Sequence, residues 1–217
     1  MIKAVFFDLD GTLVNSLSDL ADASNSALEF FGFPTHDIEK YKYFVGNGIP
    51  KLIYRIVPEE HRDEVTLAKV SRKFYEHYNV HYADNTYVYP GMKELIAELK
   101  KRGIKTAVIT NKAHAAAVDV INSLLPDTFD LIYGQRPEIP TKPDPTLTLM
   151  AMDALSVTPK DSLFLGDSRM DILTGVNSGA LPVGVLWGYR TAEELTENGA
   201  KYLIKTPMEL LKIINEN

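Results

Sequence analysis

The sequence predicts an α/β fold in which helices cover both faces of a parallel β-sheet. Short apolar runs rich in Val, Ile and Phe are typical of buried parallel strands. Amphipathic stretches with helical spacing lie between these runs, and strands that alternate with helices favour a parallel sheet. The expected strands are residues 2–9, 104–110, 129–133, 162–165 and 181–186.

Helices are expected between these strands. Residues 95–99 carry an apolar face that follows Pro90 and ends before Gly103, as a helix with a glycine stop signal does. Residues 118–125 carry a second apolar face, and residues 207–214 predict a helix that closes the domain.

One interval is too long for simple alternation. Asp8 ends the first strand and Ile104 begins the second, 96 residues later, whereas a β-α-β unit needs only about 30 residues. The excess, residues 17–84, contains many helical signals and no clear strand. We therefore expect an α-helical insertion over the end of the first strand, with aromatic side chains in its own core. Residues 1–16 and 85–217 would form the α/β core.

Composition limits the possible functions. A chain of 217 residues, 45% of them hydrophobic, is long enough for one large or two small globular domains. The absence of cysteine excludes disulfides, thiolate metal sites and cysteine nucleophiles, and fits a cytoplasmic location. A net charge of −6 without a basic stripe argues against nucleic-acid binding. The first apolar run is too short for a signal peptide, and none approaches the roughly 20 residues of a membrane span.

Four polar segments follow expected strands, where ligands bind in open parallel sheets. They are Asp-Leu-Asp-Gly-Thr at 8–12, Thr-Asn-Lys at 110–112, Lys-Pro-Asp-Pro at 142–145 and Gly-Asp-Ser-Arg-Met-Asp at 166–171. The third segment lies on a loop beyond its strand and must fold back. Together the segments predict one site at the carboxyl edge of the sheet.

The first segment can supply covalent catalysis. Asp8 can act as a nucleophile that forms an acyl-phosphate, which water then cleaves. Asp10, beside it, can protonate the leaving oxygen and later deprotonate the water. Gly11 allows a sharp turn, and the backbone N–H groups of Gly11 and Thr12 are expected to face an anionic substrate.

The other segments can stabilise a phosphoryl group. Asp167 would complete an oxygen-rich site suited to Mg²⁺, which would offset the repulsion between an anionic nucleophile and a phosphate. Lys142 would neutralise the phosphate from a second side. Thr110 and the backbone of Asn111 would hold phosphate oxygens at the start of a helix. Phosphoryl transfer needs mainly such positioning and charge stabilisation.

These segments resemble, in order, the four motifs of the haloacid dehalogenase-like hydrolase superfamily, and the resemblance covers essentially the whole chain. It implies a Rossmann-like core with a helical cap inserted after the first motif. It implies Asp8 as nucleophile, Asp10 as acid and base, and Mg²⁺ held by Asp8, the Asp10 carbonyl and Asp167. Asp171 would bind the metal or support its ligands. Asn15 stands where the family usually has Asp, at a position without a chemical role.

Within that family, residues 44–48, 110–112, 161–171 and 188–189 are similar to phosphoglycolate phosphatases. The expected substrate is therefore a small-molecule phosphate monoester, with phosphoglycolate as one candidate. Pyrophosphatases and nucleotidases share much of this pattern. We expect no nucleic-acid or membrane partner and either a monomer or a homodimer.

Three alternatives remain open. A phosphomutase of the β-phosphoglucomutase type would protect the aspartyl-phosphate from water. A binding module of the phospho-receiver type also gathers Asp, Thr and Lys around Mg²⁺, although it lacks a large insertion. A decayed phosphatase could be retained for a protein partner, but the intact motif residues argue against it.

Several other polar residues carry weaker signals. His77 and His81 lie four residues apart on an expected helix, and without a third ligand we expect them at the surface. His114 follows Lys112 closely and is a weaker candidate for substrate contact. The segment 46–48, Gly-Asn-Gly, either begins a helix or presents its amides to a substrate carboxylate. Thr110 alone is also compatible with a helix N-cap.

Overall fold

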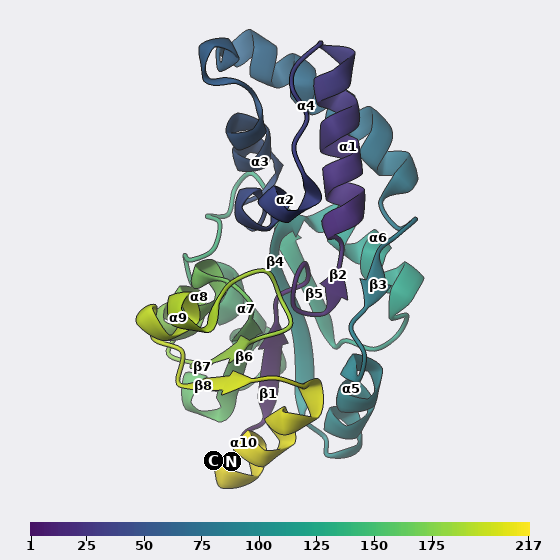
Figure 1. The fold of residues 1–217 in the computed structure, drawn as a ribbon. Coiled ribbons are helices and arrows are strands. Elements are labelled where there is room, and N and C mark those ends of the chain that lie inside the picture. Colours follow the sequence, from purple (N-terminus) through teal and green to yellow (C-terminus); the bar gives the residue numbers. More distant parts are fainter. The chain divides into compact units, whose positions relative to one another are not determined.

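The computed structural model describes residues 1–217, which form two compact units (Figure 1). One unit consists of Met1–Val14 and Val88–Asn217, and the other of Asn15–Tyr87. Where the chain passes from one to the other, the short strands β2 (Val14–Asn15) and β3 (Tyr87–Val88) form a two-stranded sheet. None of the helices combines the length and the apolar character needed to cross a lipid bilayer.

The first unit is built on a six-stranded sheet in the order β5-β4-β1-β6-β7-β8, in which all paired strands are parallel. The strands are β1 (Ala4–Phe7), β4 (Lys105–Ala113), β5 (Leu131–Gln135), β6 (Ser162–Gly166), β7 (Leu181–Val185) and β8 (Tyr202–Ile204). Because β1 lies between β4 and β6, the carboxyl ends of these three strands are neighbours.

Helices flank this sheet. They are α5 (Met92–Lys101), α6 (His114–Leu124), α7 (Thr146–Leu155), α8 (Arg169–Ser178), α9 (Ala192–Glu197) and α10 (Leu210–Glu216), with 3-10 turns η2 (Pro159–Asp161) and η3 (Pro207–Glu209).

Both faces of the sheet are covered. All four residues of β1 are buried, and successive side chains of a strand point to opposite faces. On one face, Phe6 and Phe164 belong to the same core cluster as Met152 of α7. Phe7 contacts Phe129 edge-on, with ring centroids 5.9 Å apart. The predicted α/β fold with a helix-flanked parallel sheet is thereby confirmed.

The second unit is helical. Its elements are α1 (Leu17–Phe30), α2 (Ile38–Phe44), α3 (Ile49–Ile56), the 3-10 turn η1 (Glu59–His61) and α4 (Glu64–His81). Aromatic side chains fill its core, as in the stacked pair Phe74 and Tyr78, whose centroids are 5.2 Å apart. The buried Tyr41 hydroxyl donates a hydrogen bond to Asn25 Oδ1 at 2.6 Å.

Some element boundaries differ from those expected. β4 continues to Ala113 instead of ending at residue 110, because an irregularity in its pairing with β5 lets the strand go on beyond Thr110. β5 begins at Leu131, two residues later than expected. β8 was not anticipated, since three residues at the edge of a sheet are too few to show an alternating pattern.

Candidate active site

The segment after β1 places Asp8 and a tight turn at the edge of the sheet. Gly11 has φ +89°, and a Cβ added there would lie 2.4 Å from Asp167 Oδ2. The position therefore needs glycine both for its backbone conformation and for the close approach of a carboxylate.

The amides of this turn differ from expectation. Gly11 N donates to Val14 O at 2.8 Å, and Thr12 N donates to Leu9 O at 3.3 Å. These N–H groups are used to close the turn on itself, so the structure does not direct them at a ligand as expected. Thr12 contributes its side chain instead, since its hydroxyl lies 3.4 Å from Asp167 Oδ1.

Three buried carboxylates meet at one point. Asp8, Asp167 and Asp171 each supply an oxygen atom, and these oxygens lie within 4.8 Å of one another. Asp167 follows β6, and Asp171 lies in the first turn of α8. The Asp171 side chain is oriented by a capping box, because Ser168 N and Ser168 Oγ donate to its Oδ2 at 3.0 and 2.6 Å.

Lys142 enters this cluster from the loop between β5 and α7. Its Nζ lies 2.7 Å from Asp8 Oδ1 and 2.6 Å from Asp171 Oδ1. The loop is held by Asn111, whose Oδ1 accepts a hydrogen bond from Lys142 N at 2.8 Å. The Asn111 side chain thus fixes the backbone from which the lysine extends.

Burial and crowding of like charges control the electrostatics. Burial, followed by the charge of Asp171, raises the pKa of Asp8 to about 7, against the opposing effect of Lys142. Burial also raises the pKa of Asp167 well above its usual value, and the charges of Asp171 and Asp8 add to this shift. Burial acts to lower the pKa of Lys142, but Asp171 and Asp8 together hold it above its usual value.

Asp10 lies outside the carboxylate cluster and has its own partner. Lys112 Nζ lies 3.1 Å from Asp10 Oδ1 and 3.2 Å from Oδ2. Only 6% of the lysine side chain and 17% of the aspartate side chain are exposed. The first and second polar segments are therefore joined by a largely buried ion pair.

The geometry can be compared with known proteins. A profile of the haloacid dehalogenase-like hydrolases matches residues 5–185. Phosphoglycolate phosphatase from Chromobacterium violaceum is 35% identical in an alignment that covers 98% of this chain and 96% of that protein. The chain belongs to the haloacid dehalogenase-like hydrolase family. Phosphoglycolate phosphatase 1 from Pseudomonas aeruginosa is 32% identical, with 96% of this chain and 78% of that protein covered.

Solved structures of haloacid dehalogenase-like hydrolases share the whole fold. A crystal structure from Lactobacillus delbrueckii subsp. bulgaricus, provisionally assigned as a phosphoglycolate phosphatase, has a TM-score of 0.92 at 29% identity and covers 98% of both chains. CbbY from Rhodobacter sphaeroides, solved in complex with phosphate, has a TM-score of 0.81 at 26% identity, with 97% of this chain and 96% of that chain covered. The family profile and these relatives together identify the chain as a phosphoric monoester hydrolase of this family.

The carboxylate cluster of this haloacid dehalogenase-like hydrolase fits a divalent metal. Carboxylate oxygens are the donors that Mg²⁺ prefers, and three of them converge here in a buried place. Burial and, after it, the charges of neighbouring carboxylates raise the pKa values of Asp8 and Asp167. A bound cation would relieve that repulsion.

Sequence reasoning missed several residues that build the hydrolase site. Lys112 was given no role, although it holds Asp10. Tyr189 N donates to Asp167 Oδ2 at 2.8 Å, and a Cβ at Gly188 would lie 2.1 Å from Asp167 Cβ. Only the capping box at Ser168 has a sequence signal, a serine three residues before an acidic residue. The others depend on loops whose paths the sequence does not specify.

Thr110 is inside β4, not at a helix N-cap, and its Oγ1 accepts a hydrogen bond from Lys112 N at 3.2 Å. His114 Nε2 lies 2.9 Å from Arg136 Nη2.

In the helical unit, Gly48 is the N-cap of α3, which fits the interpretation of 46–48 as a helix start. His81 Nδ1 lies 2.7 Å from Asp84 Oδ2. His77 and His81 are not part of any three-ligand group.

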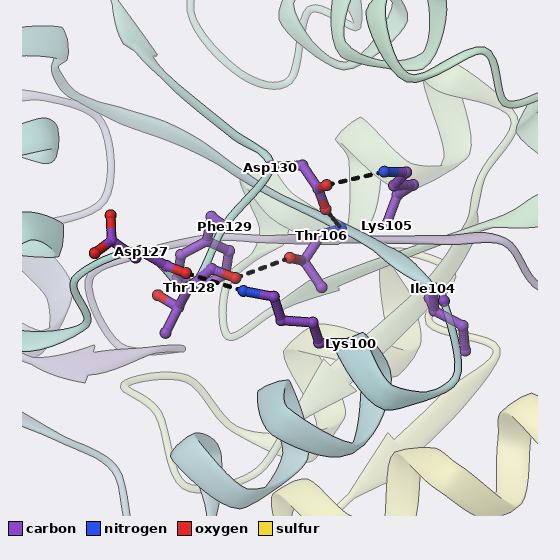
Figure 2. Close-up of a pocket in the computed structure, with 9 residues that line it drawn as sticks. Lys100, Ile104, Lys105, Thr106, Asp127, Thr128, Phe129 and Asp130 are labelled. Atoms are coloured by element: carbon purple, nitrogen blue, oxygen red, sulfur yellow. Dashed lines mark hydrogen bonds and ion pairs between the residues drawn. The ribbon is translucent and has the colours of Figure 1, made fainter.

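The α/β unit also has a different cavity, of about 220 Å³. Figure 2 draws the residues that line it. Its lining includes Lys105 at the start of β4 and Asp130 just before β5, so it lies at the amino edge of the sheet, opposite Asp8. Lys105 Nζ lies 3.1 Å from Asp130 Oδ1, and Lys100 Nζ donates to Asp127 O at 3.2 Å. These contacts link the segment before β5 to α5 and to the start of β4.

Proposed function

We propose that this hydrolase is a magnesium-dependent phosphatase that cleaves phosphoglycolate through a phosphorylated Asp8. The observation that carries the proposal is the convergence of Asp8, Asp167 and Asp171 on one point beside the Lys142 ammonium group. The choice of phosphoglycolate is supported by the relatives from Chromobacterium violaceum and Pseudomonas aeruginosa, which are phosphoglycolate phosphatases.

In the proposed first step, an Asp8 oxygen attacks the phosphorus atom, and the bond between phosphorus and the glycolate oxygen breaks. Asp10 gives its proton to the departing oxygen, so that glycolate leaves as an alcohol. In the second step, water attacks the phosphorus on Asp8 while Asp10 accepts a proton from that water. The bond to Asp8 breaks, inorganic phosphate leaves, and both side chains return to their starting states.

Lys142 has two roles in this proposal. Its ammonium group orients Asp8 through the 2.7 Å contact, and it supplies positive charge beside the phosphoryl group as the bond to the leaving oxygen breaks. Asn111 supports it by holding the Lys142 backbone. Thr110 and Asn111 are proposed to contact phosphate oxygens, since both lie towards the carboxyl end of β4, the strand that pairs with β1.

Asp8, the Asp10 carbonyl and Asp167 are proposed to hold Mg²⁺, with Asp171 as a further ligand or as a support. When bound, the ion would lower the repulsion between the anionic nucleophile and the anionic phosphate. We also propose that the inserted helical unit, Asn15–Tyr87, is the cap domain, because it follows directly after the segment that carries Asp8 and Asp10.

The test is phosphate release from a panel that contains phosphoglycolate, pyrophosphate, nucleoside monophosphates and hexose phosphates. Phosphoglycolate should give the highest kcat/KM, and Asp8→Asn should remove turnover. Asp22→Asn, which changes an exposed aspartate of α1, is the matched control and should behave as wild type. Turnover by the Asp8→Asn variant would disprove the mechanism, whereas preference for another phosphate ester would disprove only the substrate.

The covalent intermediate can be tested directly. Quenching during turnover and reduction with borohydride should convert phosphorylated Asp8 to homoserine, which peptide mass spectrometry detects. Transfer of the phosphoryl group to a sugar phosphate, with little release of inorganic phosphate, would instead identify a mutase.

A further inference from the structure

We propose that Lys112 is a positioning residue that holds Asp10 in the orientation required for proton transfer. This inference rests on the proposed function, in which Asp10 is the acid and base. Lys112 belongs to the second polar segment, and its ammonium group contacts both carboxylate oxygens of Asp10. Its role would be exerted through this contact.

The contact geometry restricts the carboxyl group of Asp10. Lys112 Nζ is almost equally distant from the two oxygens, 3.1 Å from Oδ1 and 3.2 Å from Oδ2. An ammonium group that contacts both oxygens, and is itself largely buried, restrains rotation of the carboxyl group about its bond to Cβ. An acid that must reach a leaving oxygen gains from such a fixed orientation.

The burial of Lys112 supports a specific role. Lysine is rarely buried unless it is paired, and only 6% of this side chain is exposed. Lys105, on the same strand, also lies 3.1 Å from an aspartate oxygen, that of Asp130, but 51% of its side chain is exposed. The two lysines thus lie on the same strand at the same distance from an aspartate oxygen, but Lys112 is buried and Lys105 is exposed. Lys105 is therefore a matched control.

The strand is shaped to place Lys112 here. Thr110 pairs with Gly134 of β5 and Ala113 pairs with Gln135, so two residues of β4 are accommodated between consecutive residues of β5. A Cβ at Gly134 would lie 2.7 Å from Lys112 O. The glycine therefore leaves room for the irregular backbone that carries Lys112.

The dependence of rate on the leaving group separates positioning from other roles. Ethyl phosphate and phosphoglycolate release alcohols that need a proton, whereas 2,4-dinitrophenyl phosphate releases an anion that is stable without one. The parameter to compare is kcat/KM, because it reports on steps up to the first irreversible one, here release of the leaving group. If Asp10 is displaced, kcat/KM should therefore fall for the two alkyl esters and not for 2,4-dinitrophenyl phosphate.

We expect Lys112→Met to lower kcat/KM on the order of 10²-fold or more for both alkyl esters, the scale of a positioned acid. For 2,4-dinitrophenyl phosphate the change should be within about threefold, since no proton is required. Lys112→Arg should restore part of the loss, because a guanidinium group can also pair with both carboxylate oxygens. Lys105→Met should leave all three substrates unchanged.

A double-mutant cycle completes the test. If Lys112 acts through Asp10, Lys112→Met should cause no further loss for ethyl phosphate in an Asp10→Asn background. Equal losses for all three substrates would overturn the proposal in favour of a purely structural role. Loss for phosphoglycolate but not for ethyl phosphate would overturn it in favour of direct binding of the substrate carboxylate.

These measurements also distinguish failure of the proposed phosphatase function from failure of the proposed role of Lys112. Absence of turnover in the wild-type protein overturns the proposed function and this inference with it, whereas a uniform loss in the Lys112→Met variant overturns only the role of Lys112. Should Lys112→Met yield no folded protein, Lys112→Gln replaces it. Its neutral amide carries two N–H donors but no positive charge, and the same selective loss is expected.

Discussion

Lys142 Nζ lies 2.6 Å from Asp171 Oδ1, and the exposed fractions of the two side chains are only 2% and 0%. The same ammonium group contacts Asp8, so one buried cation compensates one carboxylate that follows β1 and another in the first turn of α8. Removing one partner of a buried ion pair leaves charge that water cannot solvate, and this usually costs more than the pair itself contributes.

The first prediction concerns that buried ammonium group. Lys142→Met should lower the free energy of unfolding by about 3–5 kcal/mol, because Asp8 and Asp171 lose their compensating charge. Lys105→Met, which removes an exposed lysine from its ion pair with Asp130, should cost no more than about 1 kcal/mol. Urea denaturation of the metal-free variants measures both changes.

A second substitution checks the cause of this loss. Adding Asp171→Asn to Lys142→Met should recover part of the lost stability, since one uncompensated charge disappears. Equal costs for Lys142→Met and Lys105→Met, or no recovery in the double variant, would show that the buried charges are not the source of the destabilisation.

The second prediction concerns pH and metal. Asp8 has a pKa of about 7 in the folded chain, against an ordinary value of 3.8, so the folded state binds its proton more tightly than the unfolded state does. The resulting stabilisation is complete below the unfolded pKa and is lost as the pH rises through about 7. The slope is about 1.4 kcal/mol per pH unit for one proton between these limits.

Measurement requires chelator-treated protein between pH 5 and pH 8. The free energy of unfolding should fall with rising pH more steeply in wild type than in Asp8→Asn, which has no proton to lose at this position. Added Mg²⁺ should raise wild-type stability most at the upper end of the range, where the carboxylates are ionised. Parallel pH profiles for the two proteins would contradict the prediction.

Much of the fold could be predicted because its main features are local in the sequence. Buried parallel strands are continuous apolar runs, so β1, β6 and β7 were expected close to their observed positions. The long interval after Asp8 predicted a helical insertion without any knowledge of contacts. The three carboxylates and Lys142 were expected together because parallel strands end at one edge of a sheet.

What could not be predicted depends on backbone irregularities. The direction of the Gly11 and Thr12 amides follows from a turn that closes on Leu9 and Val14, and sequence indicates a turn there but not which N–H groups it uses. The pairing of Lys112 with Asp10 needs the irregular end of β4, which only the register with β5 reveals. A lysine at position 112 could equally well be exposed to solvent, so its residue type alone does not predict the buried pair with Asp10.

The third prediction concerns the helical unit. Asp19, in the first turn of α1, accepts hydrogen bonds from Asn85 N, Thr86 N and Thr86 Oγ1 at 2.9, 2.9 and 2.6 Å, and it is almost completely buried. Asp19→Ala would leave Asn85 N and Thr86 N without this acceptor, whereas the Thr86 hydroxyl can still donate to Tyr82 O at 3.1 Å. The loss should cost about 1–3 kcal/mol for each N–H group that stays buried. Thermal and urea unfolding measure the loss.

Asp22→Ala is the control for that experiment, because it removes an exposed aspartate from the same helix and should change stability by no more than about 0.5 kcal/mol. Asp19→Asn keeps one acceptor oxygen and should fall between the two. A loss in Asp19→Ala no larger than in Asp22→Ala would mean that the chain returning at residues 85–86 is held by other contacts.

The last prediction separates backbone strain from steric contact at Gly11. Gly11 and Gly32 both have positive φ, +89° and +70°, but a Cβ at Gly32 would meet nothing within 4 Å. Gly32→Ala should therefore cost about 1–2 kcal/mol from the left-handed backbone alone. Gly11→Ala adds a Cβ within 2.7 Å of both Asp167 oxygens, so it must displace a proposed metal ligand. It should be more destabilising than Gly32→Ala and should weaken Mg²⁺ binding in calorimetry, whereas Gly32→Ala should bind Mg²⁺ as wild type does. Unchanged binding by Gly11→Ala would show that Asp167 can shift without loss of the site.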